Sequence, residues 1–413
     1  MNLEILAYPF LFVAMYFEVF LLITLLSAPA RAARGRPLLA EETLPSVAVV
    51  VPCFNEAGTI GDTVESLLGL RYPKERLSLI LVDDGSTDDT LRELRRFERH
   101  SQVTVLQKEN GGKHTALNAG IAAAPYAEFI ACLDADSLVA PDSLRYVVSC
   151  FRHPQVAAAT GSLSIHEPRG LLGHLQYGEY FFSITLRHII SSINGLYVTP
   201  GPLSVYRRSV IQEVGGFRHG HQTEDMEMAL RIQRAGYRIE NALLARVFTK
   251  APRTLRSLLR QRIRWTSGFL RNMTGEYRDL LWNPRFGVLG LLVLPLGLVS
   301  VAGGILLFCL AIWTLIRRMA DFYVLSSGIP LDYALVPQSL DIFYAPASAT
   351  LLLALIAVTV ALGFIVLGKR LSRTKGPIRY GLAAYALCYG IIAPLWLMRA
   401  AADVATGTHR TWR

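Results

Sequence analysis

Two kinds of hydrophobic pattern divide the chain. Four apolar stretches are about 20 residues long or longer, which is the length that an α-helix needs to cross a bilayer. They are residues 5–28, 286–316, 345–367 and 380–397. Between the first two lie about 250 residues of mixed composition, enough for one sizeable α/β domain with a second lobe.

Short apolar, β-branched runs in that central region alternate with amphipathic helical series. The strand-like runs are residues 47–51, 77–82, 103–106 and 129–133. Strands that alternate with helices imply right-handed crossover connections, because the connecting helix must pack back onto the sheet. The pattern therefore predicts a parallel sheet.

The pattern changes after Pro141. A long helix is expected over residues 171–190, and a Gly/Pro-rich turn follows at residues 199–202. A further helix is expected over 223–236, where it ends near a glycine, the residue that favours a helix C-terminus. Residues 252–282 are basic and amphipathic, which predicts a helix that lies in a membrane interface.

These patterns divide the chain into four predicted regions. They are an N-terminal transmembrane anchor at 1–30, a domain at 31–251, amphipathic interface helices at 252–284, and a transmembrane region of about three helices at 285–413. The first apolar stretch could instead be a signal peptide. We expect a retained anchor, because the stretch opens with Glu4 where a signal peptide has basic residues, contains Glu18, and is longer than the apolar part of a signal peptide.

Composition and charge place the chain at a membrane. With 52% hydrophobic and 18% charged residues among 413, it is too apolar for one soluble enzyme. The net charge of +10 would suggest a nucleic-acid partner only if it were clustered on a soluble face. The cations lie beside apolar stretches instead, at Arg31, Arg34, Arg36, Lys369, Arg370, Arg373, Lys375 and Arg379. By the positive-inside rule we expect the domain to face the cytoplasm. We therefore expect a multi-pass plasma-membrane protein, and no nucleic-acid partner.

Two carboxylates follow the fourth apolar run. Asp134 and Asp136 lie two residues apart, so in extended backbone their side chains point to the same side. Carboxylate oxygens suit Mg²⁺ or Mn²⁺ that carries substrate phosphates. For an isolated pair the alternative is a solvated turn, with Asp136 and Ser137 at the start of the next helix.

Polar residues follow the other predicted strands as well, at the edge where ligands usually bind in α/β sheets. They are Asn55, Glu56, Asp83, Asp84 and Lys113. An acidic residue there commonly accepts hydrogen bonds from a nucleoside, and a lysine offers charge to phosphate, so the set predicts a nucleotide diphosphate site. A P-loop is excluded, because Gln107 and His114 stand where glycine and Ser or Thr are required.

The chain resembles the family 2 inverting glycosyltransferases of the membrane-embedded, processive synthase type in six ordered motifs: VVVPCFNEAGTI, LVDDGSTDDT, GGKHTALNAG, LDADS, TEDMEMALRIQRAGYRI and QRIRW. Cellulose, chitin, hyaluronan and poly-N-acetylglucosamine synthases are of this type. The resemblance covers residues 46–268, and the spacing of its last two motifs is highly specific. It implies an α/β GT-A-type fold, Rossmann-like with a mainly parallel sheet, joined to α-helical transmembrane segments.

The resemblance also implies a role for each motif residue. Asp225 would be the catalytic base, with Glu224 beside it, and Asp136, helped by Asp134, would hold the metal. The nucleotide site would contain Asn55, Glu56, Asp83, Asp84, Lys113, Asp134 and Arg264. The acceptor site would contain Gln261, Arg262 and Trp265, with Trp265 stacked on a sugar face.

Structural explanations exist for several of these residues. Glu224 and Asp225 in the first turn of a helix would favour its dipole without any catalysis, and Trp265 would serve as an interfacial anchor. His219 and His221 could touch an acceptor, although loop histidines usually have no such role. Residues 248–250 occupy the place of a gating loop in cellulose synthases but match it only partly.

The function that follows from the resemblance is inverting hexosyl transfer from a UDP-sugar, with UDP-N-acetylglucosamine preferred, to a growing β-linked polysaccharide. Expected partners are that donor, a glycan or lipid-linked acceptor, membrane lipid and export subunits, and the cofactor is Mg²⁺ or Mn²⁺. One alternative is a single-sugar transferase acting on a lipid, because ceramide glucosyltransferases carry a related Q-x-x-R-W. A non-catalytic exporter partner is disfavoured, because Asp83, Asp136 and Asp225 are all intact.

Overall fold

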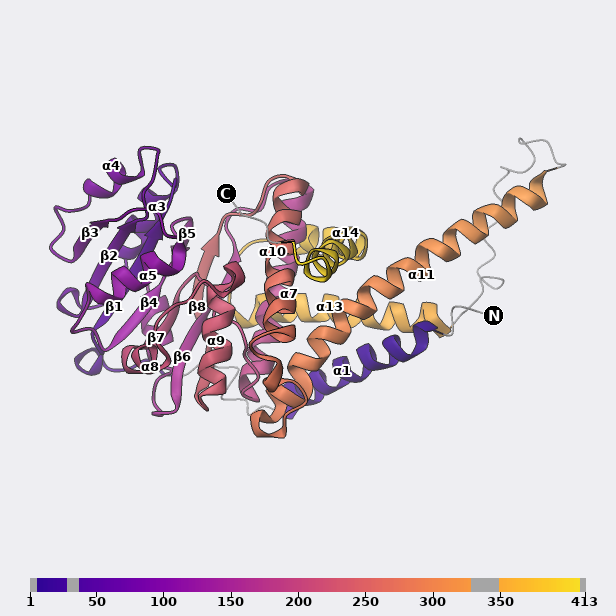
Figure 1. Ribbon diagram of the computed structural model, residues 1–413, viewed down its shortest axis with the longest axis horizontal. Helices are drawn as coiled ribbons and strands as arrows, with labels where there is room; N and C mark the ends of the chain where they lie inside the picture. The colour runs from indigo at the N-terminus through magenta and orange to yellow at the C-terminus, as the bar shows by residue number, and fades with distance from the viewer. Residues whose placement is uncertain (1–5, 28–36, 328–348, 409–413) are drawn as a thin grey trace.

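In the computed structural model, which describes residues 6–27, 37–327 and 349–408, the predicted α/β region contains one eight-stranded sheet (Figure 1). Its strand order is β3-β2-β1-β4-β7-β6-β8-β5. The strands are β1 (Val47–Cys53), β2 (Leu77–Asp83), β3 (Val103–Gln107), β4 (Phe129–Cys132), β5 (Ser137–Val139), β6 (Val156–Ile165), β7 (Ser204–Arg207) and β8 (Arg238–Thr249).

The sheet has a parallel half and a mixed half. Strands β3, β2, β1 and β4 pair in parallel, as the alternating pattern predicts. Strand β7 is antiparallel to both β4 and β6, β6 and β8 are parallel, and β5 is antiparallel to β8. The prediction of a mainly parallel, GT-A-like sheet is therefore confirmed, and the antiparallel β7 lies at its centre.

Strand β1 continues two residues beyond the predicted end at Val51. Pro52 pairs with Val82 of β2, although proline has no N–H to donate. The Val50 carbonyl accepts from Leu133, whereas the Cys53 carbonyl accepts from Asp84 on the opposite edge. The nitrogen of Pro52 therefore faces the β4 side, where the pairing with β4 has already ended at Val50, and no ladder bond is lost.

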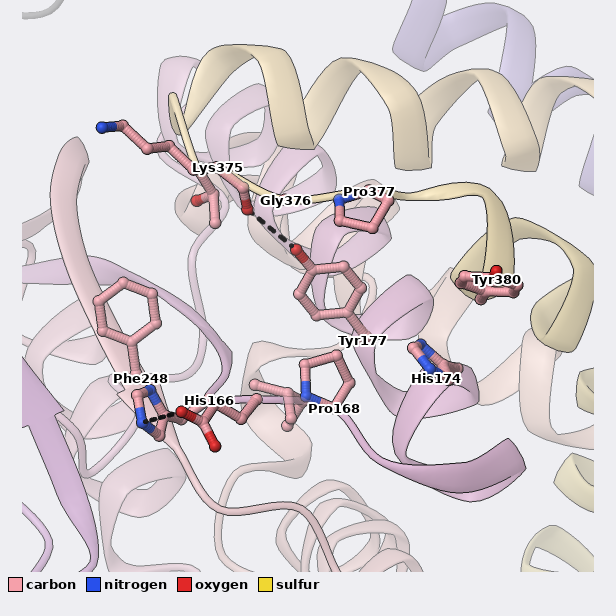
Figure 2. Close-up of a pocket in the computed structure, with 12 residues that line it drawn as sticks. His166, Pro168, His174, Tyr177, Phe248, Lys375, Gly376, Pro377 and Tyr380 are labelled. Atoms are coloured by element: carbon pink, nitrogen blue, oxygen red, sulfur yellow. Dashed lines mark hydrogen bonds and ion pairs between the residues drawn. The ribbon is translucent and has the colours of Figure 1, made fainter.

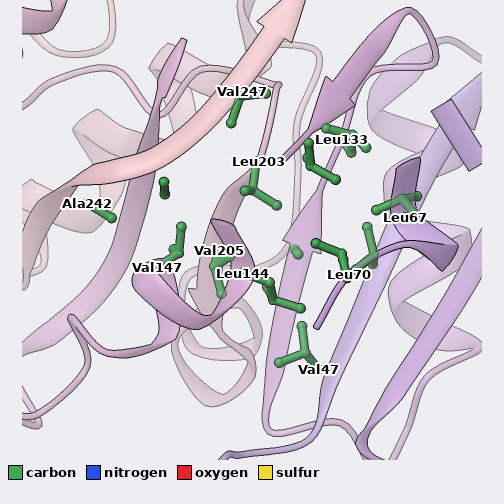
Figure 3. Close-up of a cluster of buried hydrophobic side chains, with 14 of the residues drawn as sticks. Val47, Leu67, Leu70, Leu133, Leu144, Val147, Leu203, Val205, Ala242 and Val247 are labelled. Carbon is green, nitrogen blue, oxygen red and sulfur yellow. The ribbon is translucent and has the colours of Figure 1, made fainter. Parts of the chain in front are cut away.

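Helices cover both faces of the sheet, and each face has its own apolar core. The helices of this domain are α3 (Ile60–Leu68), α4 (Thr90–Arg95), α5 (Lys113–Ala122), α6 (Ser143–Val148), α7 (Gly170–Ser192), α8 (Arg208–Val214) and α9 (Glu224–Arg234). Val47, Val49 and Val51 point to one face, while Ala48 and Val50 point to the other. Figure 3 shows the first core between the sheet and helices α3 and α6. Burial on both sides explains the continuous apolar runs of the parallel strands.

The four predicted apolar stretches form helices α1 (Ala7–Ser27), α11 (Leu294–Ser326), α13 (Ala349–Leu371) and α14 (Arg379–Ala405). All four are long and apolar enough to cross a membrane. The outermost residues of the first and third stretches, and Arg31, Arg34 and Arg36, lie outside the described residues. The proposed division of the chain into four regions remains a prediction.

Helix α10 (Leu255–Thr274) forms most of the predicted basic amphipathic segment. It begins with a capping box in which Thr254 and Ser257 bond to each other's backbone N–H groups. Its apolar residues Leu258, Ile263 and Met273 are buried. Helix α10 packs extensively against α14, and Tyr277, beyond the end of α10, donates to Glu227 of α9. It thus connects the sheet domain to the apolar helices.

Candidate active site

The predicted strand-end residues meet at one edge of the parallel half of the sheet. Asp83 is the last residue of β2 and pairs with Cys53 at the end of β1. Strand β4 ends at Cys132, two residues before Asp134. Because these strands are parallel, their carboxyl ends lie together, as the sequence predicts.

Lys113 lies at the centre of this edge. Helix α5 begins at Lys113 after Gly112, whose positive φ of +90° is readily adopted only by glycine. The Lys113 Nζ atom lies 2.6 Å from Asp134 Oδ1 and 3.3 Å from Glu224 Oε1. Burial alone would lower the pKa of Lys113, but Asp134 and Glu224 outweigh it and raise that pKa. The lysine is therefore a permanent cation that links the β4 end to the α9 start.

Asp134 and Asp136 form the predicted pair of metal ligands. Burial and repulsion from the neighbouring carboxylates of Asp134 and Glu56 raise the pKa of Asp136 to about 6. Ser137 Oγ donates to Asp136 Oδ1 over 3.1 Å. Within the described ranges no group of three or more His, Cys, Asp or Glu residues could hold a metal by itself. Two carboxylates together with substrate phosphates still fit Mg²⁺ or Mn²⁺, which are commonly bound in that way.

Glu224 and Asp225 are the first two residues of helix α9, and Glu224 is the second carboxylate beside Lys113. Burial would raise the pKa of Glu224, but Lys113 and Arg264 outweigh burial and lower that pKa. Burial and the adjacent Glu224 raise the pKa of Asp225 to about 6. Near neutral pH both carboxylates are ionised, and as the pH falls Asp225 is protonated before Glu224. A carboxylate with a raised pKa suits proton acceptance.

Helix α10 brings the QRIRW motif to this pair. Arg264 Nη1 donates to the Gln222 carbonyl over 2.8 Å, and Gly268 lies directly against Thr223. His221 and Gln222 both have positive φ values, of 53° and 65°. Consecutive left-handed residues other than glycine are strained and occur often at functional sites. The contacts fix the turn before Asp225 against α10.

Two predicted nucleotide-site residues are engaged within the protein. Asp84 accepts from Lys108 Nζ at 2.6 Å and from the N–H groups of Gly111 and Gly112, so it holds the loop before α5. Asn55 Oδ1 accepts from the N–H of Thr87 at 2.8 Å. Both shape the loops beside Asp83 and Lys113.

Arg262 and Trp265 form a second polar group on α10. Arg262 is only 3% exposed, and its Nη2 lies 2.7 Å from Glu179 Oε2 on α7. Its guanidinium also lies over the Trp265 ring, 4.3 Å from the centroid, and its Nη1 donates to Gln261 Oε1. Arg262 is therefore placed to hold Trp265 and Gln261 in position.

Three residues of the site carry no recognisable motif in the sequence. Besides Glu179, they include Gly201, where an added Cβ would lie 2.5 Å from Asp134 Oδ1 and 2.8 Å from Lys113 Nζ. The third is Arg187 on α7. These residues reach the site through tertiary packing, so only the Gly/Pro-rich turn around Gly201 offers a sequence signal.

Arg187 is a partly buried cation without a carboxylate partner in the part of the chain that the structure describes. Its Nε and Nη2 donate to Ser183 Oγ at 3.1 and 3.0 Å, and its Nη1 atom is buried with no hydrogen-bond partner among the described residues. Burial lowers its pKa, while Tyr180, Tyr197 and Asp225 lie close enough to act against that shift. A buried N–H group without a partner costs free energy, so the Nη1 atom of Arg187 is available as a donor to a ligand.

Figure 2 shows the residues that line a cavity of about 390 Å³. It is lined by the end of β6, the start of α7 and the connection between α13 and α14, including His166, Tyr177 and Lys375. Phe248, from the segment compared with a gating loop, also lines it. No residue predicted for nucleotide, metal or acceptor lines this cavity.

Comparison with known proteins gives three findings. Residues 45–268 match the family model described as glycosyltransferase like family 2. Poly-beta-1,6-N-acetyl-D-glucosamine synthases of Staphylococcus aureus are 30% identical over 260 residues, and the match spans 61% of this chain and 61% of those relatives' length. The synthase of Staphylococcus epidermidis is 27% identical over 78% of this chain and 75% of its own length.

Among solved structures, a mannosyltransferase from Pyrobaculum calidifontis, in complex with GDP-Man and Mn²⁺, has a similar fold. The TM-score is 0.63 at 20% identity, and the match covers 98% of this chain and 99% of that one. At this identity the similarity concerns the fold alone. It extends over the apolar helices as well as the sheet domain.

Proposed function

The chain belongs to glycosyltransferase family 2, and on that premise we propose that it is a membrane-bound inverting transferase that adds N-acetylglucosamine from UDP-N-acetylglucosamine to a growing β-linked polysaccharide. The donor sugar and polymeric product are supported by the names of the staphylococcal relatives. The cluster of Lys113, Asp134, Glu224 and Asp225 is the observation that carries the proposal, because it unites the donor-side and acceptor-side motifs.

The proposed reaction is a single displacement at the anomeric carbon. An acceptor hydroxyl oxygen forms the new bond while the bond to the UDP oxygen breaks, which inverts the configuration. Asp225 accepts the hydroxyl proton, and the raised pKa of its carboxyl matches a base that works near neutral pH. Glu224 stays ionised beside Lys113 and keeps the lysine next to Asp134.

The donor diphosphate is proposed to lie between the β4 end and α10. Asp136 and Asp134 would hold the divalent cation, which supplies positive charge to the leaving diphosphate when bound. Asp83, at the end of β2, would accept hydrogen bonds from the uridine. Arg264 adds a cation on the α10 side, where its charge also reaches Asp225.

The acceptor is proposed to lie along the contact of α7 with α10. Trp265 offers an aromatic face to a sugar ring. Arg262, paired with Glu179, holds the indole ring of Trp265 in place. Arg187 would donate its free Nη1 to an oxygen of the acceptor beside Asp225. This assignment supplies a hydrogen-bond partner for the buried Nη1 atom, which has none among the described residues.

The proposed setting is the plasma membrane, with the sheet domain in the cytoplasm. The basic residues between α13 and α14 support this orientation through the positive-inside rule. Membrane lipid is then a direct partner of the apolar helices. Export subunits remain a prediction from the resemblance.

The test is incubation of membranes that contain the protein with a panel of labelled UDP-sugars, followed by sizing of the product. We expect incorporation from UDP-N-acetylglucosamine into material of many sugars, and about 10²–10⁴-fold less incorporation by the Asp225→Asn protein. A product of one sugar on an extractable lipid would favour the lipid-acceptor alternative. Failure of every UDP-sugar with intact protein would refute the proposed donor class.

A further inference from the structure

Helix α14 has the composition of a membrane span. Residues 380–398 carry no charge, and the helix is long enough to cross a bilayer. Its two ends, however, contact the same side of the molecule. This arrangement is difficult to reconcile with a crossing helix.

The start of α14 lies on the first turns of α7. The Tyr177 hydroxyl donates to the Lys375 carbonyl in the connection that precedes α14, as Figure 2 shows. The backbones of Gly178 and Gly381 are so close that a Cβ at Gly178 would lie 2.8 Å from the Gly381 carbonyl oxygen. The Tyr380 ring packs 5.4 Å from His174.

The middle and the end of α14 lie on α10. Ala393, Trp396 and Ala400 pack around Ile263. Near the end of α10, Arg271 Nη2 donates to the carbonyls of Asp403 and Thr408, at 3.2 and 2.7 Å. Helix α14 therefore follows α10 from its first turns to its last.

Both supporting helices are tied to the sheet domain at each end. Helix α7 connects β6 to β7, and both strands belong to the sheet. Helix α10 follows β8, and beyond its far end Tyr277 donates to Glu227 of α9 at 2.5 Å. Arg234 of α9 pairs with Asp279 at 3.0 Å. Neither α7 nor α10 can cross a bilayer while attached in this way, so a helix that lies along both cannot cross it either.

The other apolar helices are arranged differently. In Figure 1, α1, α11 and α13 extend away from the sheet, while α14 remains beside α7 and α10 and is seen nearly along its axis. The end of α13 rests on α7, where Thr185 Oγ1 donates to the Phe364 carbonyl at 2.7 Å. The connection from α13 to α14 thus starts on the domain side of the membrane.

The face of α14 that is turned away from α7 and α10 is apolar. Leu387, Ile391 and Leu395 are exposed by 71%, 63% and 38%, and they recur every four residues on one side of the helix. Arg379 and Arg399 stand at the two ends of this strip. An apolar strip between two cations matches a helix that rests at the boundary between headgroups and acyl chains.

We propose that α14 lies flat in the membrane interface, with its exposed strip on lipid. Within the described ranges, the bilayer is then crossed only by α1, α11 and α13. The residues after α14 are then on the same side as the sheet domain. The basic residues Lys369, Arg370, Arg373 and Lys375 precede α14 on that side, where they meet anionic headgroups. This proposal does not depend on the sugar, the acceptor or the catalytic residues.

The first test is accessibility of single cysteines in cells that produce the full chain. Cys309 and Cys388, the two cysteines that are not buried, are replaced by serine. Ser327→Cys at the far end of α11, Thr374→Cys in the α13–α14 connection and Thr408→Cys after α14 are then compared with a membrane-impermeant maleimide. We expect Thr408→Cys to react under the same condition as Thr374→Cys and opposite to Ser327→Cys. Reaction of Thr408→Cys together with Ser327→Cys would overturn the proposal.

The second test measures depth and is independent of labelling at the end of the chain. Spin labels at Ala383→Cys and Leu395→Cys are placed in vesicles and exposed to oxygen and to a water-soluble nickel complex. A crossing helix would separate these positions by about 18 Å in depth, whereas a flat helix places them at similar depth. Leu352→Cys and Gly363→Cys on α13 are the matched crossing control, about 16 Å apart along that helix. Equal separation in α14 and α13 would refute a flat α14.

Discussion

The ammonium group of Lys113 lies 2.6 Å from Oδ1 of Asp134, which joins the start of α5 to the end of β4. Glu224 is the second carboxylate of this lysine, at 3.3 Å. Lys113 thereby connects the donor-side D-x-D motif to the helix that carries Asp225. Its charge also lowers the pKa of Glu224 and acts against the raised pKa of Asp225.

Replacing Lys113 by glutamine should therefore move the pH dependence of transfer. The wild-type rate should fall as the pH drops through about 6, because Asp225 becomes protonated and can no longer accept a proton. Without the lysine charge the pKa of Asp225 rises further, so the acidic limb should shift upward by about one pH unit. Rates measured from pH 5 to 9 at saturating donor test this. Lys113→Arg keeps the charge and should leave the limb in place, and a limb unmoved by Lys113→Gln would contradict the coupling.

The Asp225→Asn substitution should lower transfer by about 10²–10⁴-fold, the usual contribution of a general base. Donor affinity should survive, because the amide has nearly the same shape and the donor ligands lie on other strand ends. Calorimetry with the UDP-sugar and a radiolabelled product assay give the two readouts. Asp62→Asn, in the first turn of α3, is the matched control and should be neutral. Loss of donor binding would assign Asp225 to the nucleotide site instead.

The Asp136→Ala substitution should reduce activity by about 10²–10³-fold or more, since a metal contributes several kcal/mol to a leaving diphosphate. Excess chelator should have the same effect on the wild-type enzyme, and added Mg²⁺ or Mn²⁺ should restore it. Asp142→Ala removes a surface carboxylate that pairs with Arg71, and it should retain full activity. Wild-type turnover in excess chelator would exclude the metal.

The Arg187→Gln substitution should weaken acceptor binding by about 10–100-fold, which corresponds to one hydrogen bond from a charged donor. Donor affinity should change little, and Arg187→Lys should recover part of the loss. The readouts are the KM for an added oligosaccharide acceptor and UDP-sugar affinity. Arg92→Gln on the exposed side of α4 serves as the control. Equal loss of both affinities would indicate a purely structural role for Arg187.

The Gly201→Ala substitution should disturb the site although it replaces no charged residue. Its Cβ would lie 2.5 Å from Asp134 Oδ1, so Asp134 or the turn must move, at a cost of about 1–3 kcal/mol. We expect a lower unfolding temperature in detergent and weaker donor binding. Gly58→Ala meets no atom within 4 Å and should change neither quantity. Identical behaviour of the two variants would show that the turn adapts freely.

The sequence predicted the parallel half of the sheet well, because its physical causes are local. Val47, Val49 and Val51 face one core and Ala48 and Val50 the other, so a continuous apolar run marks the strand. Parallel strands place their carboxyl ends together, which brings Asp83 and Asp134 to one edge. The sequence also predicted that Lys113, which follows the loop before its helix, would lie at this edge of the sheet.

Contacts between distant segments could not be predicted in the same way. The resemblance assigned Arg262 to the acceptor site, but its ion pair with Glu179, a residue 83 positions earlier on α7, could not be predicted. Arg187 and Gly201 also lack a motif of their own. Their surroundings depend on how α7 and the turn before β7 pack, and no local pattern encodes that packing.

Helix α14 shows the division most clearly. Its composition determined that it would be an apolar helix of membrane-spanning length, and the sequence could say no more. Its orientation depends on the close approach of Gly178 to Gly381 and on the bonds from Arg271 to Asp403 and Thr408. A helix with one face on protein and the other on lipid is apolar all round, as a crossing helix is. Composition therefore identifies such a helix, and only tertiary contacts decide its direction.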